Sequence, residues 1–243
     1  MENIKETNPT TPTDNTKVEK ANDKQNKPNR KTHPHLFYSV WLAAFLIILT
    51  AAVSAGGWYY FGEKYIAGKA EEIRLEEQLD FYKQKAKAQP KDSNVLVDLG
   101  FTYLKLGDVD SAIESYKRAL KLDKNNFNIY LNLGIAYMDA KKYDDAAEAL
   151  VKATKISPQD YQGFMYLGMV YKEMEMYDKA LEQLGKANDL QPGSTTIIYN
   201  LGTIAEARED YQGAADVYKE ALMYDPLYKD AIEALERVEK KLK

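Results

Sequence analysis

The side chains that most often perform chemistry are scarce in this sequence. Its 243 residues include no cysteine, and its histidines are His33 and His35, both close to the N-terminus. Without cysteine the chain can form no disulfide, thiolate metal site or cysteine nucleophile, and histidine is the commonest general base and metal ligand. We therefore expect no catalytic residue, no metal site and no cofactor, and we do not expect an enzyme.

The remaining candidates for chemistry are carboxylate pairs, such as Glu71 with Glu72 and Asp144 with Asp145. Both pairs fall on expected helices, where neighbouring charges are typical of a solvated face. The string most similar to a phosphate-binding loop, 57–64, lacks the Gly-Lys-Ser/Thr ending. Beyond residue 61 the chain carries 26 Lys/Arg against 32 Asp/Glu. This mildly acidic balance disfavours nucleic acid as a partner.

The first quarter of the chain divides into a polar tail and an apolar run. Residues 1–35 are rich in Asn, Thr, Lys and Pro and predict a disordered tail, because they bury too little apolar surface to order the backbone. Residues 36–61 carry no charge and exceed the ~20 residues that cross a bilayer core. Aromatic residues at both ends match the belts that lie at headgroup level. We expect one transmembrane helix over 36–61.

The charges that flank this span predict its orientation. Five Lys/Arg lie in 20–35 and three in 62–81, which favours a cytoplasmic N-terminus and an extracytoplasmic remainder at the cell membrane. Two alternatives stay open. Cleavage after Ala55, as at the end of a signal peptide, would release a secreted soluble binding module. The reverse orientation would make a cytosol-facing receptor or adaptor.

Beyond the span, 62–90 predicts a charged helical stalk that Pro90 ends, and the sequence then repeats every 34 residues. The recurring glycines are Gly100, Gly134, Gly168 and Gly202. The recurring alanines are Ala112, Ala146, Ala180 and Ala214, and then Ala119, Ala153, Ala187 and Ala221. A tyrosine column at Tyr103, Tyr137 and Tyr171 is broken by Ala205. A period of this length indicates stacked two-helix units.

This pattern of small and large residues resembles the tetratricopeptide repeat (TPR) family. It covers four repeats, 93–126, 127–160, 161–194 and 195–228. The tryptophan usual at the fourth position is replaced by Leu96, Tyr130, Phe164 and Ile198. The resemblance implies an all-α fold: a TPR α-solenoid of four helix-turn-helix repeats over 91–228, with a C-terminal capping helix over 229–243, behind the N-terminal single transmembrane helix. It also implies a scaffold or adaptor for protein–protein interactions, in extracytoplasmic complex assembly, secretion or envelope biogenesis.

By the same resemblance, the first helix of each repeat lines a concave groove that binds a protein or peptide. Its implied residues are mainly apolar and amide side chains: Asn94, Phe101, Asn128, Leu131, Asn132, Ile135, Met165, Tyr166, Met169, Tyr199 and Asn200. Methionine adapts to irregular partners, and amides can bond an extended peptide backbone. Of the family's clamp for acidic chaperone C-termini only Asn132 is matched, so we do not expect a co-chaperone.

Overall fold

The computed structural model describes residues 34–243, although the side chains of most residues before Ile66 lie outside that description. The tail predicted for 1–35 therefore falls outside the described residues, apart from its last two. The described residues form ten α-helices and no strand, in agreement with the predicted all-α fold. The chain divides into two compact units, Met1–Tyr60 and Phe61–Lys243, and the helical repeats belong to the second.

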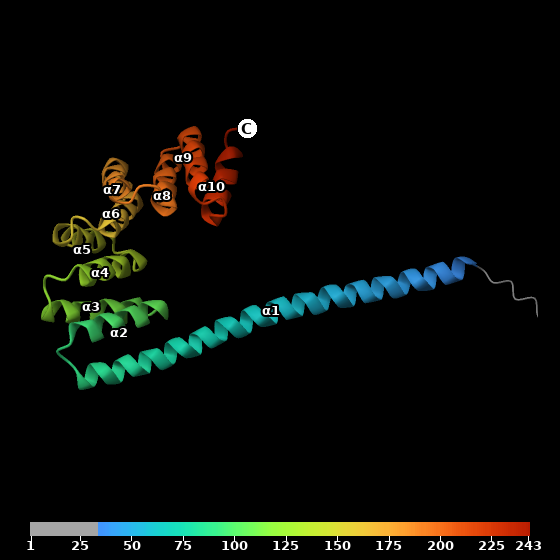
Figure 1. The fold of residues 1–243 in the computed structure, drawn as a ribbon, viewed down its shortest axis with the longest axis horizontal. Coiled ribbons are helices and arrows are strands. Elements are labelled where there is room, and N and C mark those ends of the chain that lie inside the picture. Colours follow the sequence, from blue (N-terminus) through green and yellow to red (C-terminus); the bar gives the residue numbers. More distant parts are fainter. Residues whose placement is uncertain (1–33) are drawn as a thin grey trace, which may run out of the picture. The chain divides into compact units, whose positions relative to one another are not determined.

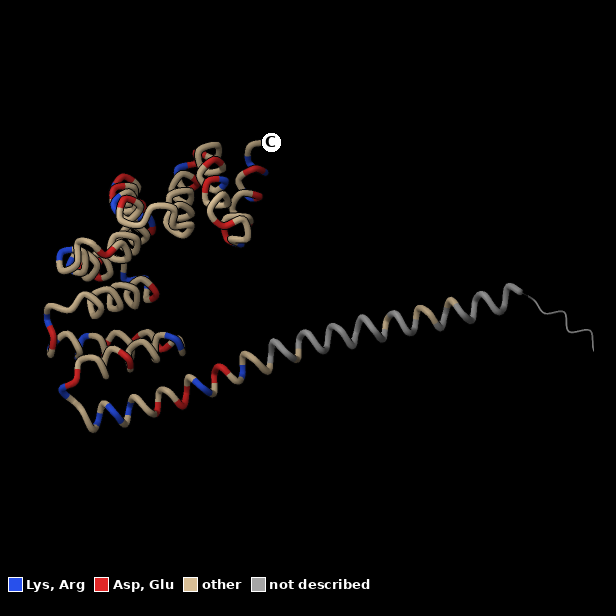
Figure 2. The backbone as a smooth tube through the Cα atoms, in the orientation of Figure 1, with Lys and Arg blue, Asp and Glu red and all other residues tan. Residues whose placement is uncertain are grey.

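Helix α1 runs from Pro34 to Ala88 (Figure 1) and crosses the boundary between the two units. The predicted transmembrane segment, 36–61, lies on its first half, where few side chains are described. Among the residues that the structure describes, no helix is both long enough and apolar enough to span a membrane. Acidic and basic residues are interspersed along the last part of α1, and its final turn carries Lys85 and Lys87, as Figure 2 shows.

Eight helices, α2 to α9, follow as four consecutive pairs, and each pair lies within one predicted repeat. We name the first helix of a pair A and the second B. The A helices are α2 (Ser93–Lys105), α4 (Phe127–Asp139), α6 (Tyr161–Glu173) and α8 (Thr195–Ala207). The B helices are α3 (Val109–Leu122), α5 (Tyr143–Ile156), α7 (Tyr177–Leu190) and α9 (Tyr211–Tyr224).

Short polar side chains explain where several of these helices begin. Asp92, Asn126 and Asp160 accept hydrogen bonds from backbone NH groups at the starts of α2, α4 and α6, so they satisfy donors that have no partner within the helix. Ser194 precedes α8 without making such a bond. Two B helices begin with the same type of cap, at Asp108 and Asp210.

A left-handed residue recurs in the turn from each A helix to its B helix. The backbone φ is 79° at Gly107, 58° at Lys141, 59° at Glu175 and 62° at Glu209. These positions are 34 residues apart. Glycine adopts this conformation without a steric penalty, whereas a side chain makes it unfavourable. Three of the four turns therefore hold a residue in a conformation that its side chain disfavours.

The pairs stack in chain order. Each helix from α2 onward packs against the next one, and each A helix also contacts the A helix of the following repeat. Within the described part of the chain, no such contact joins successive B helices. The A helices therefore form the inner wall of the stack and the B helices its outer wall. Within a pair, a Cβ atom at Gly134 would lie 2.5 Å from Leu150 Cγ, so glycine allows the close approach.

Both ends of the stack are covered by further helices. At the N-terminal end, Leu79, Tyr82 and Ala86 of α1 pack with the buried cluster of the first repeat. At the C-terminal end, α10 (Lys229–Glu239) contacts both α8 and α9, and so takes the place of a fifth A helix. Its buried residues are Ala231, Ala234 and Val238. Such end helices shield apolar surface that a solenoid would otherwise expose.

Candidate protein-binding groove

Charge is unevenly distributed over the inner wall: α2 contains Asp98 and Lys105 and α6 contains Lys172 and Glu173, whereas α4 and α8 carry little. Helices α4 and α8 are almost entirely tan in Figure 2, and their only ionisable carboxylates are Asp139 and Glu206. Neither helix contains a lysine or arginine. A surface of this kind favours apolar and neutral polar contacts over charge pairing.

Large apolar side chains recur along this wall at equivalent positions of successive repeats. Phe101 is 47 % exposed, and Ile135 and Met169 are half-buried. One turn further along two of the A helices, Leu104 and Met138 are also half-buried. We call these five residues the inner strip. It spans the A helices of the first three repeats and presents apolar surface that the fold itself does not bury.

Four of the predicted groove residues serve mainly to hold the stack together. Leu131 and Met165 are each 7 % exposed and belong to the buried clusters between repeats. Asn200 is 6 % exposed, and its side-chain amide donates to the backbone oxygen of Thr196. Tyr199 packs against two aromatic rings of α9 and the turn before α10, with ring centroids 5.7 and 5.6 Å away. Leu131, Met165 and Asn200 therefore offer a ligand little surface, and the half-buried Tyr199 is partly covered by these rings.

Polar groups border the inner strip in the first three repeats. Asn94 and Asn128 are exposed, and the half-buried Asn132 donates to the backbone oxygen of Asn128 at 2.8 Å. Tyr166 is half-buried, and burial raises the pKa of its phenol, with a neighbouring phenol and carboxylate adding to the shift. The phenol therefore stays protonated at neutral pH. It can donate a hydrogen bond to a backbone carbonyl of a bound segment.

The strip ends at the fourth repeat. There, Thr203 and Glu206 occupy the positions that Phe101 and Leu104 hold in the first repeat. The carboxylate of Glu206 accepts from Arg237 of α10, and this hydrogen bond lowers the pKa of Glu206 despite its partial burial. Polar residues and the end helix thus bound the apolar wall on this side.

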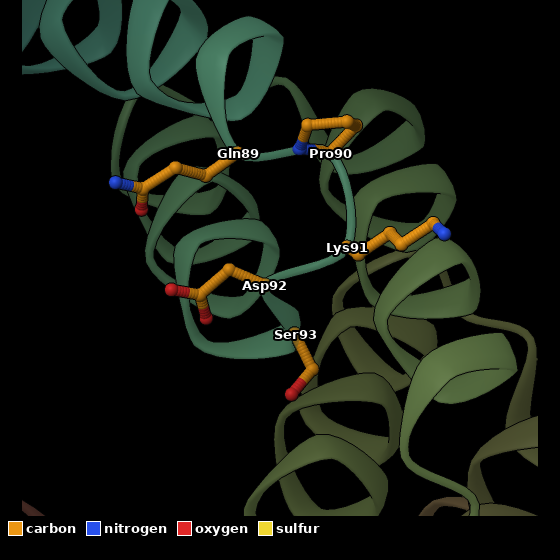
Figure 3. Close-up of a pocket in the computed structure, with 5 residues that line it drawn as sticks. All are labelled: Gln89, Pro90, Lys91, Asp92 and Ser93. Atoms are coloured by element: carbon orange, nitrogen blue, oxygen red, sulfur yellow. The ribbon is translucent and has the colours of Figure 1, made fainter.

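The turn between α1 and α2 lacks this convergence of apolar and polar groups. A hollow of about 560 Å³ lies at the turn between α1 and α2. Figure 3 shows Gln89 and Lys91 extending in opposite directions there, and the carboxylate of Asp92 is engaged in capping α2. Among the described residues, no cluster of three or more His, Cys, Asp or Glu side chains could hold a metal ion.

Comparison with known protein families agrees with the geometry. Models described as TPR repeat and tetratricopeptide repeat match residues 100–140, 127–160 and 167–227. Together these matches span half of the chain and touch all four helix pairs. Among curated proteins, none is significantly similar to this chain.

Several solved structures share the fold. MamA protein is 28 % identical, with a TM-score of 0.57, covering 65 % of this chain and 86 % of its own. MamA from Desulfovibrio magneticus RS-1 is 26 % identical, with a TM-score of 0.58 and coverage of 64 % and 88 %. YrrB, described as a TPR protein with an unusual peptide-binding site, is 21 % identical, with a TM-score of 0.57 and coverage of 69 % and 86 %. At that identity YrrB shows the fold alone.

Proposed function

The chain belongs to the tetratricopeptide repeat family, and from that premise we propose that it is a membrane-anchored scaffold whose inner wall binds a segment of another protein. The observation that carries the proposal is the inner strip. Phe101, Ile135 and Met169 expose apolar surface at the same position of three successive repeats. These side chains leave apolar surface uncovered after the repeats have packed together.

The bound segment is apolar on the side that meets the wall. Side chains on one face of a helix, or alternate side chains of an extended segment, would contact the inner strip. The amides of Asn94, Asn128 and Asn132 and the phenol of Tyr166 lie beside it as hydrogen-bonding groups. Because the inner strip itself is apolar, we expect specificity to depend on the shape and spacing of apolar anchors. The protein acts by holding a partner and performs no reaction of its own.

The anchoring part of the proposal rests on the uncharged run 36–61. Of the few side chains described in this run, Leu42, Phe45 and Leu46 are large, apolar and 49–63 % exposed, as lipid contact would require. The excess of positive charge before the run supports a cytoplasmic N-terminus. The repeats would then work outside the cytoplasm in complex assembly, secretion or envelope biogenesis.

Site-specific photo-crosslinking in the source cells tests the groove. A photoreactive benzoylphenylalanine replaces Phe101 in the full chain and crosslinks to whatever protein lies beside it. The crosslinked products are compared with those of the same chain that also carries Met169→Glu. We expect one partner adduct that Met169→Glu abolishes, because the new carboxylate would desolvate on binding. The matched control is Lys155→Glu on the exposed side of α5, which should leave the adduct unchanged. Equal adducts in all three chains would overturn the groove assignment.

Protease digestion tests the anchor and its direction. In sealed vesicles whose cytoplasmic side faces outward, we expect the repeats to be protected and the chain to resist extraction by alkaline carbonate. Digestion of the repeats in these vesicles would reverse the orientation. Release by carbonate would remove the anchor from the proposal.

A further inference from the structure

The junction between the third and fourth repeats differs from the other junctions. In the first three repeats a tyrosine of the A helix, at Tyr103, Tyr137 or Tyr171, packs in the buried clusters beside the preceding helix. In the fourth repeat this position is Ala205. The ring that fills the other junctions has no counterpart at this one.

The neighbours of that missing ring are small as well. Residues 20 positions before the tyrosines are Lys83, Lys117 and Val151, but the residue 20 positions before Ala205 is Gly185. A Cβ atom built at Gly185 would meet no atom within 4 Å. On the other side, Lys179 covers the ring of Tyr171, and the equivalent residue in the fourth repeat is Gly213. Three small residues therefore coincide around one position.

The result is an apolar recess of about 610 Å³ between α7, α8 and α9. Its walls include Leu181, Leu201, Ile204 and Val217 around Ala205. The volume lies within the range of about 300–1,000 Å³ that is usual for ligand pockets. None of the lining residues belongs to the inner strip, so the recess is a separate surface.

A cation and a carboxylate lie at the rim of the recess, and the carboxylate, Asp210, accepts from the backbone N–H of Gly213. The cation is Arg208, and Nη1 of Arg208 contacts Oδ1 of Asp178 at 3.3 Å. Both side chains are largely exposed, and exposed ion pairs of this kind contribute little to stability. The guanidinium can therefore turn toward a guest without a large penalty.

The other repeats show which guest this arrangement suits. The ammonium of a lysine lies 5.5 Å from the ring centroid of Tyr103, 5.5 Å from that of Tyr137 and 5.6 Å from that of Tyr171. An apolar slot with a cation over the ring is thus the environment that this fold provides for a tyrosine. Around Ala205 the positions equivalent to these lysines are Gly185 and Gly213. At the last junction Leu181 and Ile204 provide the slot, the cation is Arg208 from a different position, and the chain supplies no ring.

We propose that this recess is a second docking site, which receives a tyrosine side chain presented by a partner polypeptide. The guest ring would lie against Ala205, in the place that Tyr137 fills in its own repeat, and its face would meet the guanidinium of Arg208. A second copy of this chain is the less suitable source. Its exposed aromatic side chain would make a head-to-tail contact, which builds open filaments unless the rotation closes.

Direct binding of p-cresol, the tyrosine side chain in free form, tests the recess. The probe is titrated into the full chain held in lipid nanodiscs, with the methyl groups of leucine, isoleucine and valine labelled for NMR. We expect saturable shifts at Leu181, Ile204 and Val217. Ala205→Tyr should restore the chain's own ring and weaken p-cresol binding by at least about ten-fold, while raising the melting temperature because it fills the recess. Ala207→Tyr, on the exposed side of the same helix, is the matched control and should leave binding unchanged.

The source of the guest is tested in cells. Benzoylphenylalanine in place of Leu181, which lines the recess, reports any polypeptide that lies against it in the full chain. An adduct with a different protein that Ala205→Tyr abolishes supports the proposal. An adduct of twice the chain's own mass would assign the recess to a second copy and overturn it. The absence of p-cresol shifts at the recess, or equal shifts with Ala205→Tyr, would also overturn it, and neither result bears on the inner strip.

Discussion

The guanidinium of Arg237 on the end helix α10 donates two parallel hydrogen bonds to the carboxylate of Glu206 on α8. Its Nε lies 2.7 Å from Oε1 of Glu206, and its Nη2 lies 2.9 Å from Oε2. The hydroxyl of Tyr218 donates to the same Oε2 at 2.7 Å. Two-point pairing of this kind fixes direction as well as distance. Because its members come from α8, α9 and α10, it fastens the end helix to the last repeat.

Arg237→Ala should lower the stability of the folded chain. We expect the free energy of unfolding to fall by about 1 kcal/mol, since the carboxylate of Glu206 would lose its main partner. The matched control is Lys229→Ala, which removes an exposed ion pair within α10 at 3.4 Å and should change little. Chemical denaturation of both variants gives the comparison. Equal losses would show that the pairing does not fasten α10.

The contribution of Glu206 to the stability of the folded chain should depend on pH. The hydrogen bond from Arg237 lowers its pKa in the folded state below the ordinary value of 4.5, so folding favours the ionised form. Its stabilising contribution is fully present above the unfolded pKa and is lost as the pH falls through the lower folded pKa. We therefore expect the stability difference between the native chain and Glu206→Gln to be constant near neutral pH and to shrink in acid. If the stability difference between the two chains grew in acid, the pKa of Glu206 would not be lowered by folding.

Two buried tyrosines at equivalent positions should respond differently to loss of the hydroxyl. Tyr116 and Tyr218 are both fully buried, but only the hydroxyl of Tyr218 has a hydrogen-bond partner in the protein. Tyr218→Phe should reduce the free energy of unfolding by about 1–2 kcal/mol, because the bond to a charged group is lost. Tyr116→Phe should be neutral or stabilising, since it removes a buried polar group without a partner. A larger loss from Tyr116→Phe would disprove the contrast.

The left-handed turn residues predict a stabilising substitution. Glu175 has a φ of 59°, and a non-glycine residue in this region is disfavoured by roughly 1 kcal/mol. Glu175→Gly should therefore raise the melting temperature, although added freedom in the unfolded chain will offset part of the gain. Gly107→Ala, at the equivalent turn with a φ of 79°, is the reciprocal change and should lower it. Thermal melts of the two variants should move in opposite directions.

Most of the helix-pair architecture was predictable because it depends on a few residue types at a fixed interval. Gly134 and Ala146 mark where helices must approach closely, and such positions admit little variation. The left-handed turn was not predicted, because Lys141, Glu175 and Glu209 occupy it without any glycine signal. Backbone strain of this kind is set by the stacked helices on either side.

The groove was predicted less completely than the fold. The pattern gives the face of a helix on which a residue lies, but burial depends on how far the next repeat covers that face. Phe101 and Met165 were both expected in the groove, yet one is 47 % and the other 7 % exposed. The break in the tyrosine column at Ala205 was visible in the sequence. Its coincidence with Gly185 and Gly213 appears only when three helices are brought together.

The same three small residues have a mechanical consequence. In a solenoid each repeat contacts only its neighbours, so its curvature is the sum of small rotations between successive repeats. The joint between the third and fourth repeats lacks the large ring present at the others, so we expect curvature to change there with the least repacking. The last repeat and its end helix would then tilt together, which would adjust the span of the concave surface to guests of different width.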